Sequence, residues 1–338
     1  MAVIATGFFD GVHLGHRLVL DTLVSCARKK GQEAIVVTFK QHPRVVLQQD
    51  ASMLRLLNSP EEKRTLLMAA GIDRVEYVDF TPAFAALTTR EYLQFLKDRF
   101  GATTIILGYD NRIGSDQLDP EKTSLIAKEL SLDTVVVGEC NAVDGSCPGK
   151  TVSTLGRVRG RGPLPEAVGG MERSGSFAGQ ATIGSAISST KIRRALQEGD
   201  VCLAAQMLGY RYMMSGEVVH GNKIGRTLGY PTANISLAEP LKMIPGNGVY
   251  LVEAEVDGRN FWGMANIGVR PTVGGVSLTV ETHIFDFSED IYGHTLTIRF
   301  ATRLRGEQKF ASLDELKKNL AADEVRCREM LNDQRFRF

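Results

Sequence analysis

Two kinds of apolar spacing divide the chain. Within the first 138 residues, short runs rich in β-branched residues alternate with stretches of helical apolar spacing. The runs lie at 3–6, 34–39, 74–80, 103–108 and 133–138, and the helical stretches at 17–30, 60–70, 89–100 and 120–130. This alternation is typical of a parallel sheet with helices on both faces. We therefore predict an α/β domain that binds its ligand beyond the carboxyl ends of the strands.

The segment 139–186 interrupts this pattern. It is rich in Gly, Ser, Thr and Arg and has almost no apolar periodicity, so we predict a long mobile loop. Helical spacing returns at 191–198, where Ser188 or Ser189 is placed to cap a helix, and again at 201–208. We predict domains at 1–209 and 210–338.

The second domain reads as all-β. Short alternating segments separated by Gly and Pro turns lie at 216–220, 232–235, 248–258, 259–268, 278–287 and 295–304. Closely spaced strands of this kind indicate a small closed barrel. Apolar residues at helical spacing over 313–331 predict a C-terminal helix packed across that barrel.

Composition limits the class of protein. The chain of 338 residues is 43% hydrophobic and 23% charged, as in folded globular proteins. We find no apolar run near the roughly 18 residues that a membrane span needs. The N-terminal residues Met1 to Ile4 carry no basic segment and no cleavage site of a signal peptide. We therefore expect a cytoplasmic protein that does not bind membranes.

Charge and cysteine content exclude further classes. Forty basic residues oppose 39 acidic ones, giving a net charge of +1, so no global field attracts nucleic acid. The five cysteines are odd in number and show no CxxC pair, which argues against a disulfide framework and against a zinc site. Any anion binding must therefore be local, and the sequence leaves the oligomeric state unknown.

A first candidate phosphate site lies at the first strand-to-helix turn. His13-Leu14-Gly15-His16 places two imidazoles there, and Gly11 and Gly15 allow close approach of the backbone. The amino end of a helix supplies unpaired N–H groups and partial positive charge, which attract anions. A pair of ordinary surface histidines is the alternative.

A second phosphate-binding element follows at 188–193, with the sequence SSTKIR. Hydroxyl donors at a helix start, followed by Lys191 and Arg193, form a cradle for phosphate, although a capped basic helix has the same pattern. The sequence GSCPGKT at 145–151 is one residue short of a P-loop and does not open into a helix. Arg157, Arg159 and Arg161 are better explained by a solvated loop than by RNA binding.

The second domain carries its own candidate site. In GYPTAN at 229–234, Thr232 and Asn234 offer hard oxygen ligands suited to Mg²⁺ that carries nucleotide phosphates. Upstream, the basic loop with Gly221, Gly225 and Arg226 is able to cover phosphates. Downstream, Glu281 alternates with apolar neighbours and faces away from Val280, as a solvated strand residue would also do.

These motifs in this order carry a family resemblance. GFFDGVHLGH and ISSTKIRRALQEGDV resemble the nucleotidylyltransferase superfamily, and specifically the FMN adenylyltransferase module of bifunctional prokaryotic riboflavin kinase/FAD synthetases. The resemblance implies that His13, His16 and Gly11 contact ATP. Ser189, Thr190, Lys191 and Arg193 would stabilise the pyrophosphate side, and Asp110 would lie near the flavin.

The second half resembles the riboflavin kinase module of the same family. The similarity rests on GxVVHGxxxGRxLGYPTAN, GVY, ANIGVRPTVGG and ETHIFDF. It implies that Glu281 accepts the proton of the riboflavin hydroxyl, while Thr232 and Asn234 organise Mg²⁺ and ATP. Gly221, Gly225 and Arg226 would cover the nucleotide, and Arg270 would belong to a flap near the flavin.

The resemblance implies phosphorylation of riboflavin to FMN and adenylylation of FMN to FAD, both from ATP and with Mg²⁺. The expected fold is a nucleotidylyltransferase-like parallel sheet domain, followed by a small all-β riboflavin-kinase-like barrel with a C-terminal helix. Near Lys40, and at Asn111 and Ile113, the chain departs from the family's usual residues. One alternative is therefore a riboflavin kinase with a degenerate adenylyltransferase domain, and another is a non-catalytic flavin- or nucleotide-binding regulatory protein.

Overall fold

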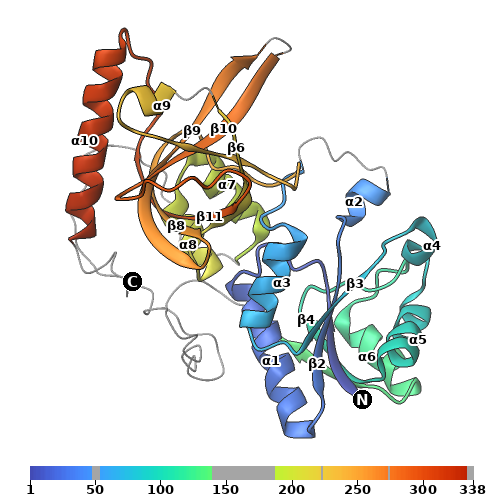
Figure 1. The fold of residues 1–338 in the computed structure, drawn as a ribbon. Coiled ribbons are helices and arrows are strands. Elements are labelled where there is room, and N and C mark those ends of the chain that lie inside the picture. Colours follow the sequence, from blue (N-terminus) through green and yellow to red (C-terminus); the bar gives the residue numbers. More distant parts are fainter. Residues whose placement is uncertain (48–53, 139–186, 222–223, 273–274, 333–338) are drawn as a thin grey trace. The chain divides into compact units, whose positions relative to one another are not determined.

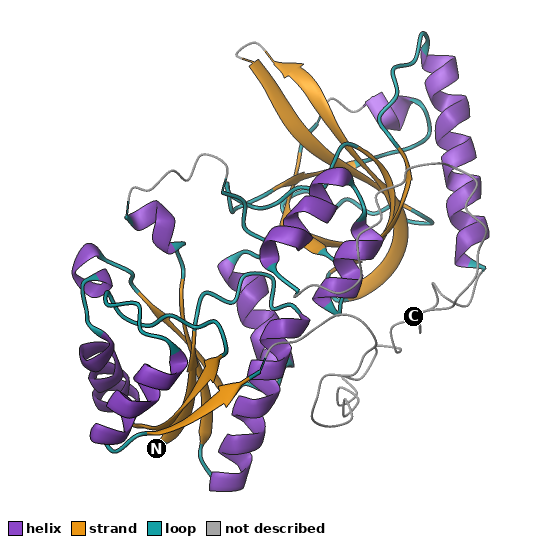
Figure 2. Cartoon of the chain, turned by 180° about the vertical axis from the view of Figure 1, so that it is seen from behind, coloured by secondary structure: helices purple, strands orange, loops and turns teal. Residues whose placement is uncertain are grey.

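The computed structural model describes residues 1–47, 54–138, 187–221, 224–272 and 275–332, and for residues 270–272 and 275–277 it describes the backbone alone. The chain divides into two compact units between Ser189 and Thr190. Figure 1 shows both units as a ribbon, and Figure 2 shows them from behind. The expected mobile loop at 139–186, the P-loop-like GSCPGKT and the RGR sequence lie outside the described residues.

The first unit contains a five-stranded parallel sheet in the order β3-β2-β1-β4-β5. The predicted strands and long helices are present. The strands are β1 (Ala2–Thr6), β2 (Glu33–Phe39), β3 (Arg74–Val78), β4 (Ala102–Gly108) and β5 (Asp133–Val137). The helices are α1 (Leu14–Lys30), α2 (Pro43–Val46), α3 (Pro60–Ala69), α4 (Pro82–Ala85), α5 (Thr89–Phe100) and α6 (Pro120–Glu129).

Helices cover both faces of this sheet, as predicted. Leu20 and Leu23 of α1 and Leu67 of α3 pack with Val3 and Val36 on one face. On the other face, side chains of α5 and α6 pack with the alternate strand residues, such as Ile4, Ile35 and Ile105. Because successive side chains of a strand point to opposite faces, β1, β2 and β4 contribute to both cores.

Local capping explains where the helices begin. Ser59 and Thr88 each form a capping box, with Glu62 and Glu91 respectively, at the starts of α3 and α5. α1 begins at Leu14 rather than at the expected residue 17, because the His13 side chain accepts a hydrogen bond from the first turn. The short helices α2 and α4 are not predicted by the sequence pattern.

The second unit contains a closed barrel in the order β10-β7-β6-β11-β8-β9, which confirms the all-β prediction. Its strands are β6 (Met213–Val219), β7 (Ala233–Ser236), β8 (Gly248–Val256), β9 (Arg259–Thr272), β10 (Gly275–Ile284) and β11 (Thr295–Arg305). The expectation for the last part of β10 is wrong: the strand ends at Ile284 rather than at 287. The one-turn helix α9 (Ile224–Thr227) lies within the loop predicted to cover phosphates.

Helices α7 (Ser189–Glu198), α8 (Val201–Leu208) and α10 (Leu313–Leu331) complete the described structure. Gly246 N donates to Leu196 O at 2.8 Å, which joins α7 to the barrel unit. Contacts thus group α7 and α8 with the barrel, whereas the sequence boundary at 209 places them in the first domain. The predicted packing of α10 is confirmed, since Cys327, Leu320 and Met330 join a core with Leu251 and Phe285.

Candidate active sites

The first site occupies the carboxyl edge of the parallel sheet. The loop between β1 and α1 contains Gly11 and His13 and lies where the strand order reverses between β1 and β4. Such a switch point leaves a crevice in which α/β proteins bind ligands. β4 ends beside it at Gly108, and Asn111 Nδ2 donates to Thr6 O at 3.4 Å. Asp110, predicted near the flavin, is exposed just after β4.

His13 and His16 lie against each other at the start of α1. Their ring centroids are 3.7 Å apart and the rings are inclined by only 14°. The His16 N–H donates to His13 Nδ1 at 3.3 Å, so the neutral His13 ring carries its hydrogen on Nε2. The two imidazoles that the sequence places at this turn therefore lie stacked on each other.

The electrostatics of this pair favour neutral imidazole at position 16. Burial, with smaller contributions from His13 and Lys63, holds the pKa of His16 well below its ordinary value. His16 Nδ1 is buried and has no hydrogen-bond partner within the described part of the chain. A neutral ring with a buried, unsatisfied nitrogen is able to bind a polar ligand without first releasing a proton.

Buried polar groups fix the loop between β1 and α1. Asp10 accepts twice: its Oδ1 bonds the Leu57 N–H at 2.9 Å, and its backbone oxygen bonds the Ser189 hydroxyl at 2.9 Å. Lys63, only 1% exposed, lies with Nζ 3.7 Å from the centre of the Phe8 ring. Sequence analysis did not identify Lys63, because nothing in a helical Glu-Glu-Lys run distinguishes a buried lysine from a solvated one.

The hydrogen bond to Asp10 thus places Ser189 at the loop between β1 and α1. The remaining residues of the predicted second cradle lie on α7, where Thr190 and Lys191 are exposed and Arg193 is partly buried. Arg193 is followed by Arg194, which is exposed and bonds Glu198 at 3.0 Å. The two neighbouring arginines therefore differ in environment.

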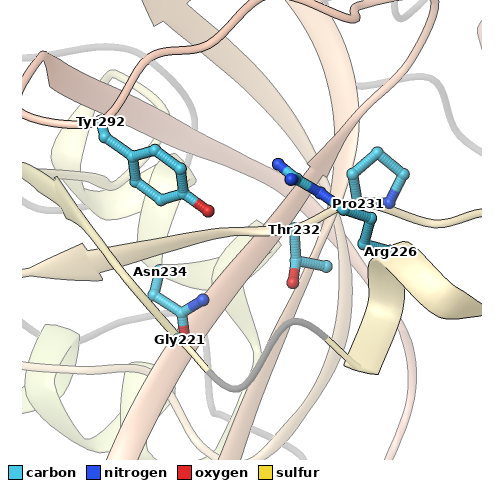
Figure 3. A pocket seen from close by; sticks show the side chains of 6 residues that line it. All are labelled: Gly221, Arg226, Pro231, Thr232, Asn234 and Tyr292. Carbon is cyan, nitrogen blue, oxygen red and sulfur yellow. The ribbon is translucent and has the colours of Figure 1, made fainter.

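The second site is a pocket on the barrel (Figure 3). Gly221, Arg226, Pro231, Thr232, Asn234 and Tyr292 line it. It brings together the predicted PTAN residues and the predicted nucleotide-covering loop, although Asn222 and Lys223 lie outside the described residues. Tyr292 was not predicted; its ring lies against His220 with centroids 3.9 Å apart.

Glu281 lies directly beside the PTAN segment. The Thr232 hydroxyl donates to Glu281 Oε2 at 3.2 Å, and Glu281 is opposite Asn234 in the antiparallel pairing of β10 with β7. A hydroxyl and a carboxylate therefore touch, and an amide side chain lies on the residue paired with that carboxylate. These are the hard ligands that Mg²⁺ prefers, so the donor set fits a magnesium ion that also binds phosphate.

Glycine is required in the covering loop by close contacts. A Cβ atom on Gly221 would lie 2.3 Å from Asn234 Nδ2, and one on Gly225 would lie 2.2 Å from Tyr230 O. The contact at Gly225 is with backbone and excludes a side chain, whereas a side chain at position 221 would displace the amide of Asn234. The backbone of this loop therefore lies in close contact with residues 230–234. The side chain of Arg270 lies outside the described part of β9.

No described helix is long and apolar enough to cross a membrane. Among the same residues, no three His, Cys, Asp or Glu side chains cluster as a metal site.

The chain matches a different family model in each of its two halves. Residues 1–146 match the family model for FAD synthetase, and residues 208–331 match the model for riboflavin kinase. A bifunctional riboflavin kinase/FMN adenylyltransferase of Escherichia coli K12 is 34% identical over 97% of this chain and 92% of its own length. The protein of the same name from Bacillus subtilis is 31% identical over 95% and 90%.

A crystal structure named as a macrolide-efflux protein of Streptococcus pneumoniae has a TM-score of 0.78 and 30% identity, over 97% of this chain and 93% of that one. Its fold is therefore shared, while the efflux function in its name describes that protein. The family matches define a two-domain protein with an FAD synthetase domain and a riboflavin kinase domain. The chain belongs to the family of bifunctional riboflavin kinase/FMN adenylyltransferases.

Proposed function

We propose that this chain catalyses two consecutive reactions, phosphorylation of riboflavin to FMN and adenylylation of FMN to FAD. The observation that carries the proposal is the contact between Thr232 and Glu281, which joins the PTAN segment to a carboxylate. A strand carboxylate that served only as a solvated group would not require a hydrogen bond from Thr232. The paired His13 and His16 rings supply the corresponding feature in the first domain.

In the kinase reaction, the riboflavin 5′-hydroxyl attacks the γ-phosphorus of ATP, its proton passes to Glu281, and ADP leaves. A carboxylate has about four lone-pair positions, so the hydrogen bond from Thr232 is compatible with this role. Thr232 and Asn234 hold Mg²⁺ and ATP, while Gly221, Gly225 and Arg226 cover the phosphates and Arg270 contacts the flavin. Bound Mg²⁺ neutralises phosphate charge.

In the adenylyl transfer, a phosphate oxygen of FMN attacks the α-phosphorus of ATP and pyrophosphate leaves. Catalysis of this kind rests on positioning and on neutralising charge. His13, His16 and Gly11 bind ATP phosphates, with Ser189, Thr190, Lys191 and Arg193 on the pyrophosphate side and Asp110 near the flavin. Both reactions consume ATP, which supports the proposed cytoplasmic location.

One observation favours a second candidate function, riboflavin kinase activity alone. Asn111 bonds the end of β1 at a position where the resemblance leads one to expect phenylalanine, so the flavin side of the first site differs from the usual pattern. Incubating the protein with riboflavin, Mg²⁺ and ATP and separating the flavins by chromatography tests both. FAD formation supports the two-reaction proposal, FMN without FAD supports the kinase alone, and unchanged riboflavin refutes both.

A further inference from the structure

His283 and Glu281 lie on the same face of β10. They are two residues apart, and Thr282 between them is fully buried on the opposite face. Both side chains reach the same short segment: Glu281 accepts from the Thr232 hydroxyl at 3.2 Å, and His283 Nδ1 lies 2.8 Å from Pro231 O. Two side chains on one face of β10 therefore bond two consecutive residues of the PTAN motif, Pro231 and Thr232.

The backbone pairing between β10 and β7 ends before it reaches this segment. Glu281 pairs with Asn234 and Thr282 with Ala233, and the ladder stops there. Continued pairing is unfavourable, because Pro231 has no N–H group to donate. The His283 imidazole therefore forms a hydrogen bond between the two segments just beyond the last backbone pair of the ladder. Since a carbonyl oxygen only accepts, His283 Nδ1 must carry the hydrogen.

Aromatic neighbours orient the His283 ring. Tyr230 lies edge-on to it with centroids 5.2 Å apart, and Phe285 lies edge-on at 5.9 Å. Tyr230 and Phe285 in turn pack in one apolar core with residues of α10. The donor is thus held in place by packing, as precise positioning of a site residue requires.

We propose that His283 is a positioning residue of the kinase site: its Nδ1–H group fixes the Pro231 carbonyl and so places Thr232 against Glu281. The Pro231 carbonyl shares a planar peptide unit with the nitrogen and Cα of Thr232, so fixing that oxygen fixes the start of Thr232. This inference rests on the proposed kinase function and adds a residue that touches no substrate.

Two substitutions of similar shape separate the hydrogen bond from packing. Asn carries an N–H₂ group on Cγ, as His carries Nδ1, and Leu has the same branched shape without a donor. We expect His283→Leu to lower kcat for riboflavin phosphorylation by about 10- to 100-fold and to raise the KM for MgATP, as for a misplaced reacting group. The KM for riboflavin should change by less than about twofold, because riboflavin does not contact Thr232 in the proposed arrangement.

His283→Asn should retain at least about one third of wild-type kcat, because it restores the donor. Equal activity of the Leu variant and the wild type overturns the proposal. Equal loss in both variants also overturns it, since a packing role would affect them alike. FAD formation from supplied FMN, made by the other domain, should not change in either variant.

Calorimetric titration with ADP and Mg²⁺ provides a readout that does not depend on turnover. His283→Leu should weaken MgADP binding, and His283→Asn should restore it. If the wild type makes no FMN, the proposed function fails, while this titration still decides whether His283 positions the segment. If the wild type is active and all three proteins bind MgADP equally, the inference about His283 fails alone.

Discussion

His13 and His16 form a stacked pair in which the backbone of one residue bonds the ring of the other. Their centroids are 3.7 Å apart, and His16 N donates to His13 Nδ1. Residues i and i+3 at a helix start lie on one face, which brings the rings together. The arrangement makes a compact aromatic surface at the sheet edge, with His16 held neutral by burial and by its neighbours.

The neutral state of His16 predicts a pH dependence of stability. Its folded-state pKa is lowered from the ordinary 6.5, so below about pH 6.5 the unfolded chain binds a proton that the folded chain does not. This group therefore lowers the free energy of unfolding as pH falls, by at most about 1.4 kcal/mol per pH unit. Urea unfolding of wild type and His16→Asn between pH 7 and 5 should show a weaker pH dependence in the variant. Parallel curves would contradict the neutral assignment.

Glu281→Gln should reduce FMN formation by about 100- to 10,000-fold, since the amide keeps the shape and still accepts from Thr232 but no longer takes a proton. The measurement is the initial rate of FMN production from riboflavin and ATP. FAD production from supplied FMN is the internal control and should be unaffected. A rate within a few-fold of wild type would return Glu281 to the role of a solvated strand residue.

Arg193→Ala should lower FAD formation from FMN by about 100-fold or more, the effect of removing a preorganised phosphate contact. Arg194→Ala is the matched control, because Arg194 is exposed on the same helix and pairs with Glu198. Riboflavin phosphorylation should persist in both variants. If the two substitutions have the same effect on FAD formation, Arg193 has no special role in the cradle.

The ion pair between Arg305 and Asp323 should stabilise the packing of α10. Arg305 Nη2 lies 2.7 Å from Asp323 Oδ2, and the two side chains are 18% and 10% exposed. Arg305→Met leaves a buried carboxylate without its partner and should cost about 3–5 kcal/mol in free energy of unfolding. Arg305→Met with Asp323→Leu should recover much of that loss.

The exposed pair of Arg259 and Glu289 is the control for this prediction. Its side chains are 48% and 56% exposed, so solvent screens the pair and Arg259→Met should lower the free energy of unfolding far less than Arg305→Met. Denaturant unfolding followed by circular dichroism measures all variants. Similar losses for Arg305→Met and Arg259→Met would show that burial does not strengthen the first pair.

Local sequence patterns predicted the long helices well, because apolar residues recur in them at a regular spacing. α5, α8 and α10 begin and end where apolar spacing and capping residues predict. The helices α2 and α4 were not predicted, because four residues are too few to show a periodic pattern. For α4, Thr81 followed by Pro82 is a capping signal. The end of β10 was extended too far, since the apolar residues after Ile284 continue the pattern without continuing the ladder.

By itself, the sequence determined the two-domain architecture, the family and the residues of both candidate phosphate-binding motifs, because these depend on local spacing and on short motifs. Tertiary structure alone decided which distant groups meet. Thr232 reaches Glu281 only because β7 pairs with β10, and His283 bonds Pro231 only because that pairing ends at Ala233. The burial of Lys63 beneath Phe8 has no local signal either. Such contacts depend on strand register and core packing, which join residues far apart in the chain.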